Sequence, residues 1–305
     1  MTSPRRISYG VALPHRSTEP IAPEVVATVA RRAEELGFRD VWVTENTVDP
    51  NFSFDPFVVL TYAAAVTRSI RLAVAVVVLP VRHPIHVAHQ VASLDWLSNG
   101  RALLGVGLGR PPHYADFAVP MERRVARFTE SLRVLRELWA GPAVTLEGEF
   151  YRLQGVTLGV RPVQRPVPVW LGGDHFNAIR RAARLGDGWI SGGGGGTKAE
   201  FAHQVTILKE SLAAAGRDPD QFPISKRLFV AIDEDRSRAR AMLETWFGTV
   251  YRDAAKAETH GIYGGVEEVR EQIEAFAAAG ATHLLLNPVT RYEEQLERVA
   301  DVVRR

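Results

Sequence analysis

The chain alternates strand-length apolar segments with longer segments of helical periodicity, and this alternation continues almost to its last residue. The short segments are apolar at nearly every position, as is typical of parallel strands covered by helices on both faces. In the longer segments, apolar residues recur every three or four positions, which predicts helices that bury one face. The expected strands span residues 7–13, 40–43, 70–79, 102–106, 167–171, 189–190, 224–232 and 282–286.

Helices are expected between these strands. Pro84 suits the first turn of a helix that runs to residue 97, and Gly37 ends an earlier helix. Another helix covers residues 56–66, and two more flank the last strand. A long helix after the fourth strand has one apolar stripe, formed by Val125, Phe128, Leu132, Leu135 and Trp139.

Eight strands alternating with helices over 305 residues predict an α/β fold, a (β/α)8 TIM barrel with insertions. An open, doubly wound sheet is the alternative. Residues 141–168 are rich in glycine and proline and predict a small hairpin insertion, and no break in composition divides residues 1–305 into separate domains. The glycines at 105, 107 and 109 lack the dinucleotide-binding GxGxxG spacing, and Pro111-Pro112 is expected to disrupt a helix there.

The amino-acid composition narrows the class of protein. The chain has no cysteine, which excludes disulfides, thiolate nucleophiles and cysteine-ligated metals, and its net charge of +2 does not suggest nucleic acid. The first residues are too polar for a signal peptide, and no apolar run is long enough to cross a membrane. His83, His86 and His89 have helical spacing but no nearby carboxylate, so no metal site is expected. We expect a cytoplasmic enzyme that acts on a small molecule.

The active site of a barrel lies at the carboxyl ends of its strands. Those ends carry His15, Glu45, Asn46 and Arg110, with His113 close by. Glycines follow three strands, including the pair at 172–173 and the run from 192 to 196 that contains Gly193 and Gly194. Glycine lets backbone N–H groups approach a phosphate or a flat ring. A solvated Glu45, an ordinary turn at the glycine pair and a flexible glycine loop are the alternatives.

The sequence resembles the luciferase-like monooxygenase superfamily, particularly its deazaflavin-dependent oxidoreductases that use coenzyme F420. The most specific segment is RHPIHVAHQVASLDWLSNGRALLGVGLGR, at residues 82–110. Supporting segments are AEELGFRDVWVTEN (33–46), FTESLRVLRELW (128–139), PVPVWLGG (166–173) and ARLGDGWI (183–190). The resemblance covers nearly the whole chain and implies a barrel with an isoalloxazine-like ring at its mouth.

The resemblance also implies site residues. It places a non-prolyl cis peptide behind the ring at Ala75-Val76, and a phosphate-binding turn at Gly172-Gly173. The implied cofactor contacts fall on Glu45, Ala75, Val76, Val78, Leu108, Gly109, His113, Gly172, Gly173, His175 and Phe176. Two positions depart from the sugar-phosphate dehydrogenase branch, where histidine and glutamate flank the hydride-transfer site, because this chain has Asn46 and Arg110 there.

These departures favour reduction of an activated C=C, C=N or C=O bond over alcohol oxidation. Arg110 is expected to stabilise the developing anion, and His15 or His113 to deliver the proton. The first alternative is an FMN-dependent monooxygenase of a two-component system. The second alternative is a non-catalytic flavin-binding protein. The resemblance is compatible with two kinds of partner, a second copy of the chain in a homodimer and a separate flavin or F420 reductase.

Overall fold

The computed structural model describes residues 7–192 and 196–304, and its centre is a closed barrel of eight parallel strands. The chain forms these strands in the order β1, β3, β5, β6, β9, β10, β11 and β13, and each pairs with the next. Pairing of β13 with β1 closes the ring. The strands are β1 Ser8–Ala12, β3 Asp40–Val43, β5 Arg71–Val78, β6 Ala102–Gly107, β9 Val169–Gly172, β10 Gly188–Ser191, β11 Ile224–Ile232 and β13 His283–Pro288. The predicted TIM barrel is confirmed, and the open sheet is excluded because the ring closes.

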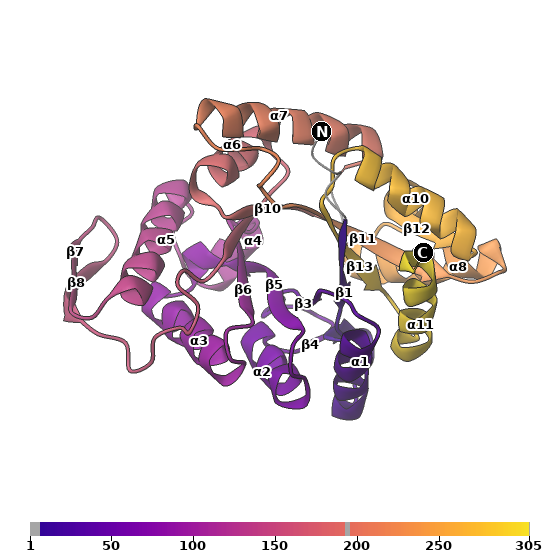
Figure 1. The fold of residues 1–305 in the computed structure, drawn as a ribbon, viewed down its shortest axis with the longest axis horizontal. Coiled ribbons are helices and arrows are strands. Elements are labelled where there is room, and N and C mark those ends of the chain that lie inside the picture. The colour runs from indigo at the N-terminus through magenta and orange to yellow at the C-terminus, as the bar shows by residue number, and fades with distance from the viewer. Residues whose placement is uncertain (1–6, 193–195, 305) are drawn as a thin grey trace.

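Helices surround the barrel on its outside (Figure 1). They are α1 Pro23–Glu35, α2 Pro56–Val66, α3 Pro84–Leu97, α5 Arg124–Ala140, α6 Phe176–Leu185, α7 Lys198–Ala214, α8 Arg236–Trp246, α10 Val266–Ala278 and α11 Tyr292–Val303. The stripe predicted on α5 is buried except at Val125, which is 44% exposed because it lies in the first turn, at the end of the packed face. None of the described helices is long and apolar enough to cross a membrane.

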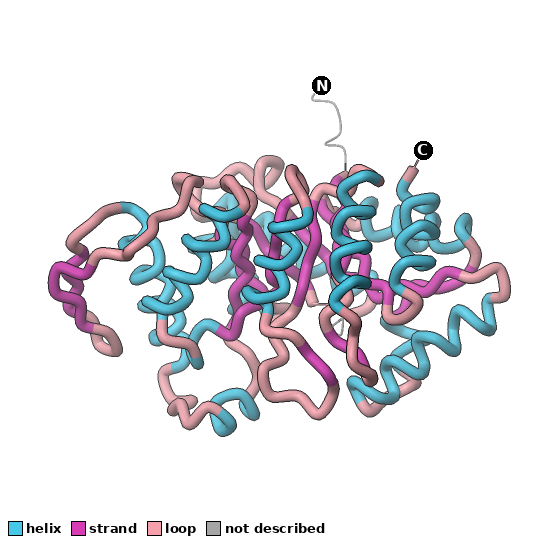
Figure 2. Tube along the Cα trace, turned by 90° about the horizontal axis from the view of Figure 1, so that it is seen from below, coloured by secondary structure: helices cyan, strands magenta, loops and turns pink. Residues whose placement is uncertain are grey.

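The hairpin predicted within residues 141–168 is present. It consists of β7 Val144–Glu147 and β8 Arg152–Val156, which pair antiparallel. Figures 1 and 2 show it projecting from one side of the ring, outside α5 and away from the barrel. It therefore contributes nothing to the barrel mouth.

Several short elements escaped prediction because they are too brief to show a period. They are β2 Arg16–Ser17, β4 Phe52–Ser53, α4 Pro111–Asp116, the π-helical turn η2 Phe247–Tyr251, α9 Lys256–His260 and β12 Gly261–Gly264. The expectation that Pro111-Pro112 disrupts a helix is wrong, since α4 begins at Pro111. The first N–H groups of a helix need no partner within it, so prolines are accepted in its first turn.

The interior of the barrel is partly polar near the amino ends of the strands. Nε2 of His283 lies 2.9 Å from Oδ1 of Asp40, and its Nδ1 lies 2.7 Å from Oγ of Ser225. The indole of Trp42 also donates a hydrogen bond to Asp40. These buried contacts link three strands and leave the carboxyl ends of the strands as the open side of the barrel.

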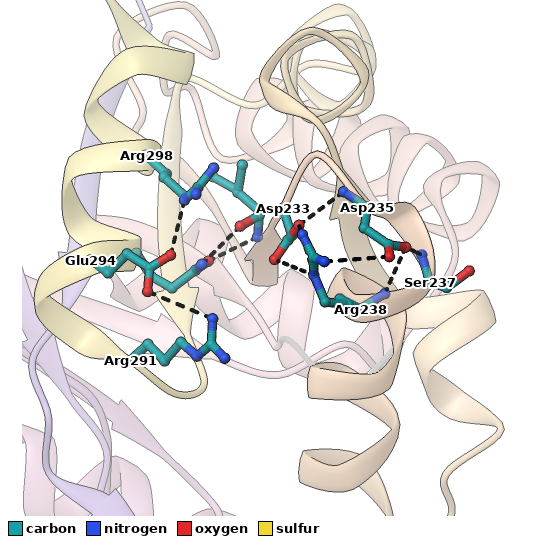
Figure 3. A network of polar contacts seen from close by, with 9 residues as sticks. Asp233, Asp235, Ser237, Arg238, Arg291, Glu294 and Arg298 are labelled. Carbon is teal, nitrogen blue, oxygen red and sulfur yellow. Dashed lines mark hydrogen bonds and ion pairs between the residues drawn. The ribbon is translucent and has the colours of Figure 1, made fainter.

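The carboxyl end of β11 is held by the helices on either side of it (Figure 3). Gln295 of α11 accepts a hydrogen bond from the N–H of Ile232 at 2.8 Å and donates one to its carbonyl at 2.8 Å. Just beyond the strand, the Asp233 carboxylate pairs with Arg238 of α8 at 2.7 Å. The end of β11 is thus fixed from both sides.

Candidate active site

The floor of the mouth is built around an irregular end of β5. The register between β5 and β6 shifts between Val74 and Val77, and the Ala75-Val76 peptide bond is cis, as predicted. The Val76 side chain lies so close to two neighbouring strands that a Cβ at Gly107 or Gly172 would come within 2.7 or 2.8 Å of its methyl groups. Glycine at both positions therefore makes room for Val76.

Glu45 holds the end of β5 in place. One carboxylate oxygen accepts a hydrogen bond from the Val78 N–H at 2.7 Å, and the other accepts one from Nε of Arg82 at 2.6 Å. Its side chain is 4% exposed, so Glu45 is not the solvated loop acid considered as an alternative. Burial opposes the charge of Arg82, but attraction to Glu45 and Asp55 outweighs it and raises the pKa of Arg82. Glu45 is placed to position backbone rather than to exchange protons.

Three predicted residues meet at the end of β6. Gly109 has a φ of +70°, and a Cβ there would come within 2.4 Å of Val78 and 2.7 Å of Nδ1 of His113. That nitrogen accepts a hydrogen bond from the Arg110 N–H at 3.0 Å, so the ring proton of neutral His113 lies on Nε2. Burial and the charge of Arg110 lower the pKa of His113. Arg110 is exposed, and no carboxylate within the described parts of the chain pairs with its guanidinium.

His15 does not have the contacts expected of a proton donor. Its Nδ1 lies 2.7 Å from the Leu13 carbonyl, which only accepts, and its Nε2 accepts from the Thr44 N–H at 3.0 Å. Both nitrogens are therefore committed, with the proton on Nδ1. Burial, reinforced by the nearby charges of Arg227 and Arg16, lowers the pKa of His15 to about 3. The ring links β1 to β3, and Asn46 joins this group by donating to Oγ1 of Thr44 at 2.7 Å.

The predicted phosphate turn needs one revision. Gly173 has a φ of +140°, but its N–H already donates to the Ile190 carbonyl at 3.2 Å, so it has no free amide for a phosphate. In the described segments, the backbone N–H groups of Asp174 and His175 donate no hydrogen bond, and they are the amides available at this turn. His175 caps the first turn of α6, and the centre of its ring lies 4.1 Å from that of Phe176. The predicted Gly193 and Gly194 lie outside the described residues.

A charged pair beside this turn was missed by sequence reasoning. The Asp174 carboxylate accepts from the Gly192 N–H at 3.1 Å, and Nζ of Lys226 donates to the Gly192 carbonyl at 2.7 Å. Burial raises the pKa of Asp174, whereas it lowers that of Lys226 to about 8. Lys226 and its neighbour Arg227 are charged residues in a strand that is apolar at most other positions, and this was the available signal. Arg82, also missed, could have been found as the strand-end cation nearest to Glu45.

The ends of β3, β5, β6 and β9 thus bring together most of the predicted cofactor residues, from Glu45 to Gly172. The sequence profile of the luciferase-like monooxygenase family matches residues 7–290, nearly the whole chain. The chain belongs to this family.

Relatives of the chain carry different activities in their names. A Nakamurella multipartita protein, named F420-dependent glucose-6-phosphate dehydrogenase, is 30% identical over 249 residues, which are 79% of this chain and 73% of that protein. The 5,10-methylenetetrahydromethanopterin reductase of Archaeoglobus fulgidus is 28% identical over 253 residues, 79% of this chain and 71% of the reductase. The crystal structure of monooxygenase RslO1 from Streptomyces bottropensis has a TM-score of 0.85 at 25% identity and covers 97% of this chain and 98% of that one.

Proposed function

We propose that this luciferase-like protein is an F420-dependent oxidoreductase that reduces an activated C=C, C=N or C=O bond of a small organic substrate. The names of the dehydrogenase and reductase relatives support the cofactor and the class of enzyme. The direction of the reaction rests on the side chains at the mouth. Because deazaflavin has carbon at position 5 and does not form the usual flavin–oxygen adduct, the identity of the cofactor largely decides the reaction.

The mouth has features that suit a flat ring and a phosphate. Val76 packs closely against Gly107 and Gly172, which add no side chain of their own, and Gly109 lets the backbone approach Val78 and His113. The amides of Asp174 and His175, at the start of α6, are oriented by the same turn as Gly173 and suit the cofactor phosphate. These residues would hold the cofactor when it is bound.

The observation that carries the proposed direction is that the candidate bases are held by hydrogen bonds to other groups of the protein. Both carboxylate oxygens of Glu45 and both ring nitrogens of His15 are engaged. Asn46 is not basic, and Arg110 stays protonated. Oxidation of an alcohol needs a base, and such help contributes about 100- to 10,000-fold to the rate. Of the predicted catalytic residues, the two that remain, Arg110 and His113, are donors, which suits reduction.

In this reaction the bound, reduced cofactor supplies a hydride. The exposed Arg110 guanidinium stabilises the negative charge that develops on the substrate. Neutral His113 has its proton on Nε2, pointing away from the Arg110 N–H, so of the two predicted histidines it is the one that can donate a hydrogen bond to the substrate, while water delivers the proton. His15 helps instead by fixing the strand ends on which Glu45 and Asn46 lie.

The cofactor can be tested by titrating the purified protein with F420 and FMN and following fluorescence. We expect tighter binding of F420, and oxidation of reduced F420 only when an enone, imine or ketone is supplied. Glucose 6-phosphate serves as the control substrate, and we expect no reduction of F420 with it. Robust glucose 6-phosphate oxidation would contradict the proposed direction.

A second candidate is the FMN-dependent monooxygenase, favoured by the structural match to a monooxygenase. Preferential binding of FMN, with oxygen consumption when reduced FMN is supplied, would replace the proposal with this function. Binding of either cofactor without turnover of any substrate would support the non-catalytic alternative.

A further inference from the structure

A groove lies at the amino ends of β9 and β10, at the opposite end of the barrel from the mouth. Its volume is about 540 Å³, within the range of about 300–1,000 Å³ that is usual for small-molecule sites. The lining comes from the last turn of α5, from residues 164–167 before β9, from residues 184–187 before β10, and from Arg217 after α7. α5 and α6 are neighbours in the ring of helices (Figure 1). The groove is therefore separate from the predicted cofactor site.

The charge of this groove is strongly unbalanced. Its charged side chains are one carboxylate, Asp187, and four guanidiniums, those of Arg136, Arg165, Arg184 and Arg217. The carboxylate is already engaged, because its Oδ2 accepts from the Val169 N–H at 2.9 Å and from Nη2 of Arg136 at 3.4 Å. Among residues 7–192 and 196–304, no carboxylate pairs with the other three arginines. Arginine stays protonated, so the groove has a lasting excess of positive charge.

Most of the guanidinium N–H groups of the groove are available to a ligand. Arg217 donates from Nη1 to the carbonyls of Ala183 at 2.8 Å and Gly186 at 2.7 Å, and within the described parts of the chain its Nε and Nη2 donate nothing. Arg165 and Arg184 are exposed, and their side chains donate no hydrogen bond to any described residue. Each guanidinium is a planar fork that matches two oxygens of a phosphate or a carboxylate.

The rest of the lining is mainly apolar. It includes Trp139, Ala140, Pro166, Val167 and Leu185. The indole N–H of Trp139 already donates to the Ala88 carbonyl at 3.0 Å, so what the indole adds to the groove is apolar ring surface. A ligand that suits both parts of the lining has an apolar body and an anionic group.

The positive charge continues along α6. Arg184 also lines a second groove, of about 560 Å³, together with Arg180 and Arg181, and no carboxylate is among the described residues of that lining. Burial and the charge of Arg184 lower the pKa of Arg181, which shows that these cations are crowded. A concentration of one sign of charge attracts ligands of the opposite sign, so the second groove increases the attraction of anions to the first.

We propose that the groove between α5 and α6, which we call the α5–α6 groove, binds an organic phosphate, a molecule with an apolar body and a phosphate group. A phosphate monoester has a charge of about −1.5 to −2 at neutral pH and three acceptor oxygens, so one group can engage two or three arginines. A carboxylate has one charge and two oxygens and matches fewer of them. The proposal goes beyond the oxidoreductase function, because it adds a second ligand at the other end of the barrel.

Four probes separate the charge from the apolar body. 2-Naphthyl phosphate has both, 2-naphthoate has the same ring with a single charge, 2-naphthol has the ring alone, and inorganic phosphate has the charge alone. Binding is measured by calorimetric titration of the parent protein without F420, at a pH above the second phosphate pKa of about 6. We expect saturable binding of 2-naphthyl phosphate, and binding of the other three that is weaker by about 10-fold or more.

Substitutions locate the bound probe. The double variant Arg165→Met and Arg184→Met should weaken binding of 2-naphthyl phosphate by about 10-fold or more, and both side chains are exposed, so the fold should be kept. Arg133→Met is the matched control, because Arg133 is an exposed arginine of α5 outside the groove that pairs only with Glu137, at 3.9 Å. Arg110→Ala removes the exposed arginine of the mouth. Both of these variants should bind the probe as the parent does.

Each outcome decides one part of the proposal. Equal binding by the parent and the double variant would overturn it, and so would loss of binding in Arg110→Ala, which would place the probe at the mouth. Equal affinity for 2-naphthoate would overturn the choice of phosphate, and equal affinity for inorganic phosphate would overturn the part given to the apolar lining. These probe comparisons use the parent protein, so they remain decisive if the double variant fails to fold.

The experiment is also independent of the proposed function. Binding of F420 without binding of 2-naphthyl phosphate would overturn the α5–α6 groove alone. Binding of 2-naphthyl phosphate that is lost in the double variant, without binding of F420, would overturn the proposed function alone.

Discussion

Glu45→Gln is the most informative substitution at the mouth, because it changes one oxygen to an amide while keeping the shape of the side chain. Glutamine can still accept from one of the two donors that Glu45 serves, the Val78 N–H or Nε of Arg82. Its NH₂ group then faces the other donor. The substitution therefore loses one hydrogen bond to a charged group and places two donors against each other.

The magnitude follows from the burial of the pair. The side chains of Glu45 and Arg82 are 4% and 16% exposed, so solvent screens the interaction little. A hydrogen bond to a charged group contributes about 1.5–3 kcal/mol, and the unmatched donor adds to the loss. We expect a loss of about 2–4 kcal/mol, short of the full cost of breaking a buried pair because Asp55 still pairs with Arg82 at 3.1 Å.

For a chain of 305 residues this loss is measurable by calorimetry. The entropy of unfolding for this length is about 0.6 kcal/mol per degree, so the melting temperature should fall by about 3–6 °C. Because Val78 loses its anchor beside the predicted ring, affinity for F420 should fall about 10-fold as well. Glu147→Gln is the matched control, since Glu147 and Arg152 are 66% and 81% exposed, and its effect should stay below about 0.5 kcal/mol. Equal melting temperatures and F420 affinities for the two variants would refute the role given to Glu45.

Three further predictions concern the turn, the histidine and the arginine. Gly173→Val should weaken F420 binding and lower the stability of the protein, because φ is +140° there and a Cβ would lie 2.8 Å from Ala178. F420 titration and thermal melting measure the two effects. Gly141→Val is the control, because a Cβ at Gly141 would meet no atom within 4 Å. The parent should lose stability as the pH falls from about 6.5 towards 3, by up to about 1.4 kcal/mol per pH unit from His15, because the unfolded state takes up a proton that buried His15 excludes. Denaturant unfolding at pH 7 and pH 5 should show a smaller loss for His15→Gln, and an identical loss would show that His15 is not the group responsible. Arg110→Ala should reduce kcat/KM for the reduction about 10- to 100-fold, and an unchanged value would remove Arg110 from the mechanism.

The architecture could be predicted because barrel strands and their covering helices have strong periods. α3, β3 and β11 begin and end at the predicted residues, since buried apolar runs and a proline in the first turn mark those positions clearly. The short elements after β11 could not be predicted, because four or five residues contain too little of a period to be recognised.

The roles of individual residues were harder to predict from the sequence than the fold. The cis bond at Ala75-Val76 followed from a resemblance, because nothing in two small apolar residues by themselves requires it. The commitment of both nitrogens of His15 and the engaged N–H of Gly173 depend on partners brought close only by closure of the barrel. Arg227 lies in a strand otherwise rich in apolar residues, and only the completed structure reveals that no carboxylate of residues 7–192 and 196–304 pairs with it.

β11 is nine residues long and has more than one set of neighbours. Its first residues pair with β10 and complete the ring, whereas its last four, from Phe229, pair with β12 outside it. The segment between β11 and β12, which includes Trp246, is consequently anchored at both ends to the part of β11 that extends beyond the ring. Changes in that segment can accumulate through evolution, and be made by an engineer, while the cofactor side of the barrel stays as it is. One scaffold can in this way acquire new substrates by exchanging a single stretch of chain.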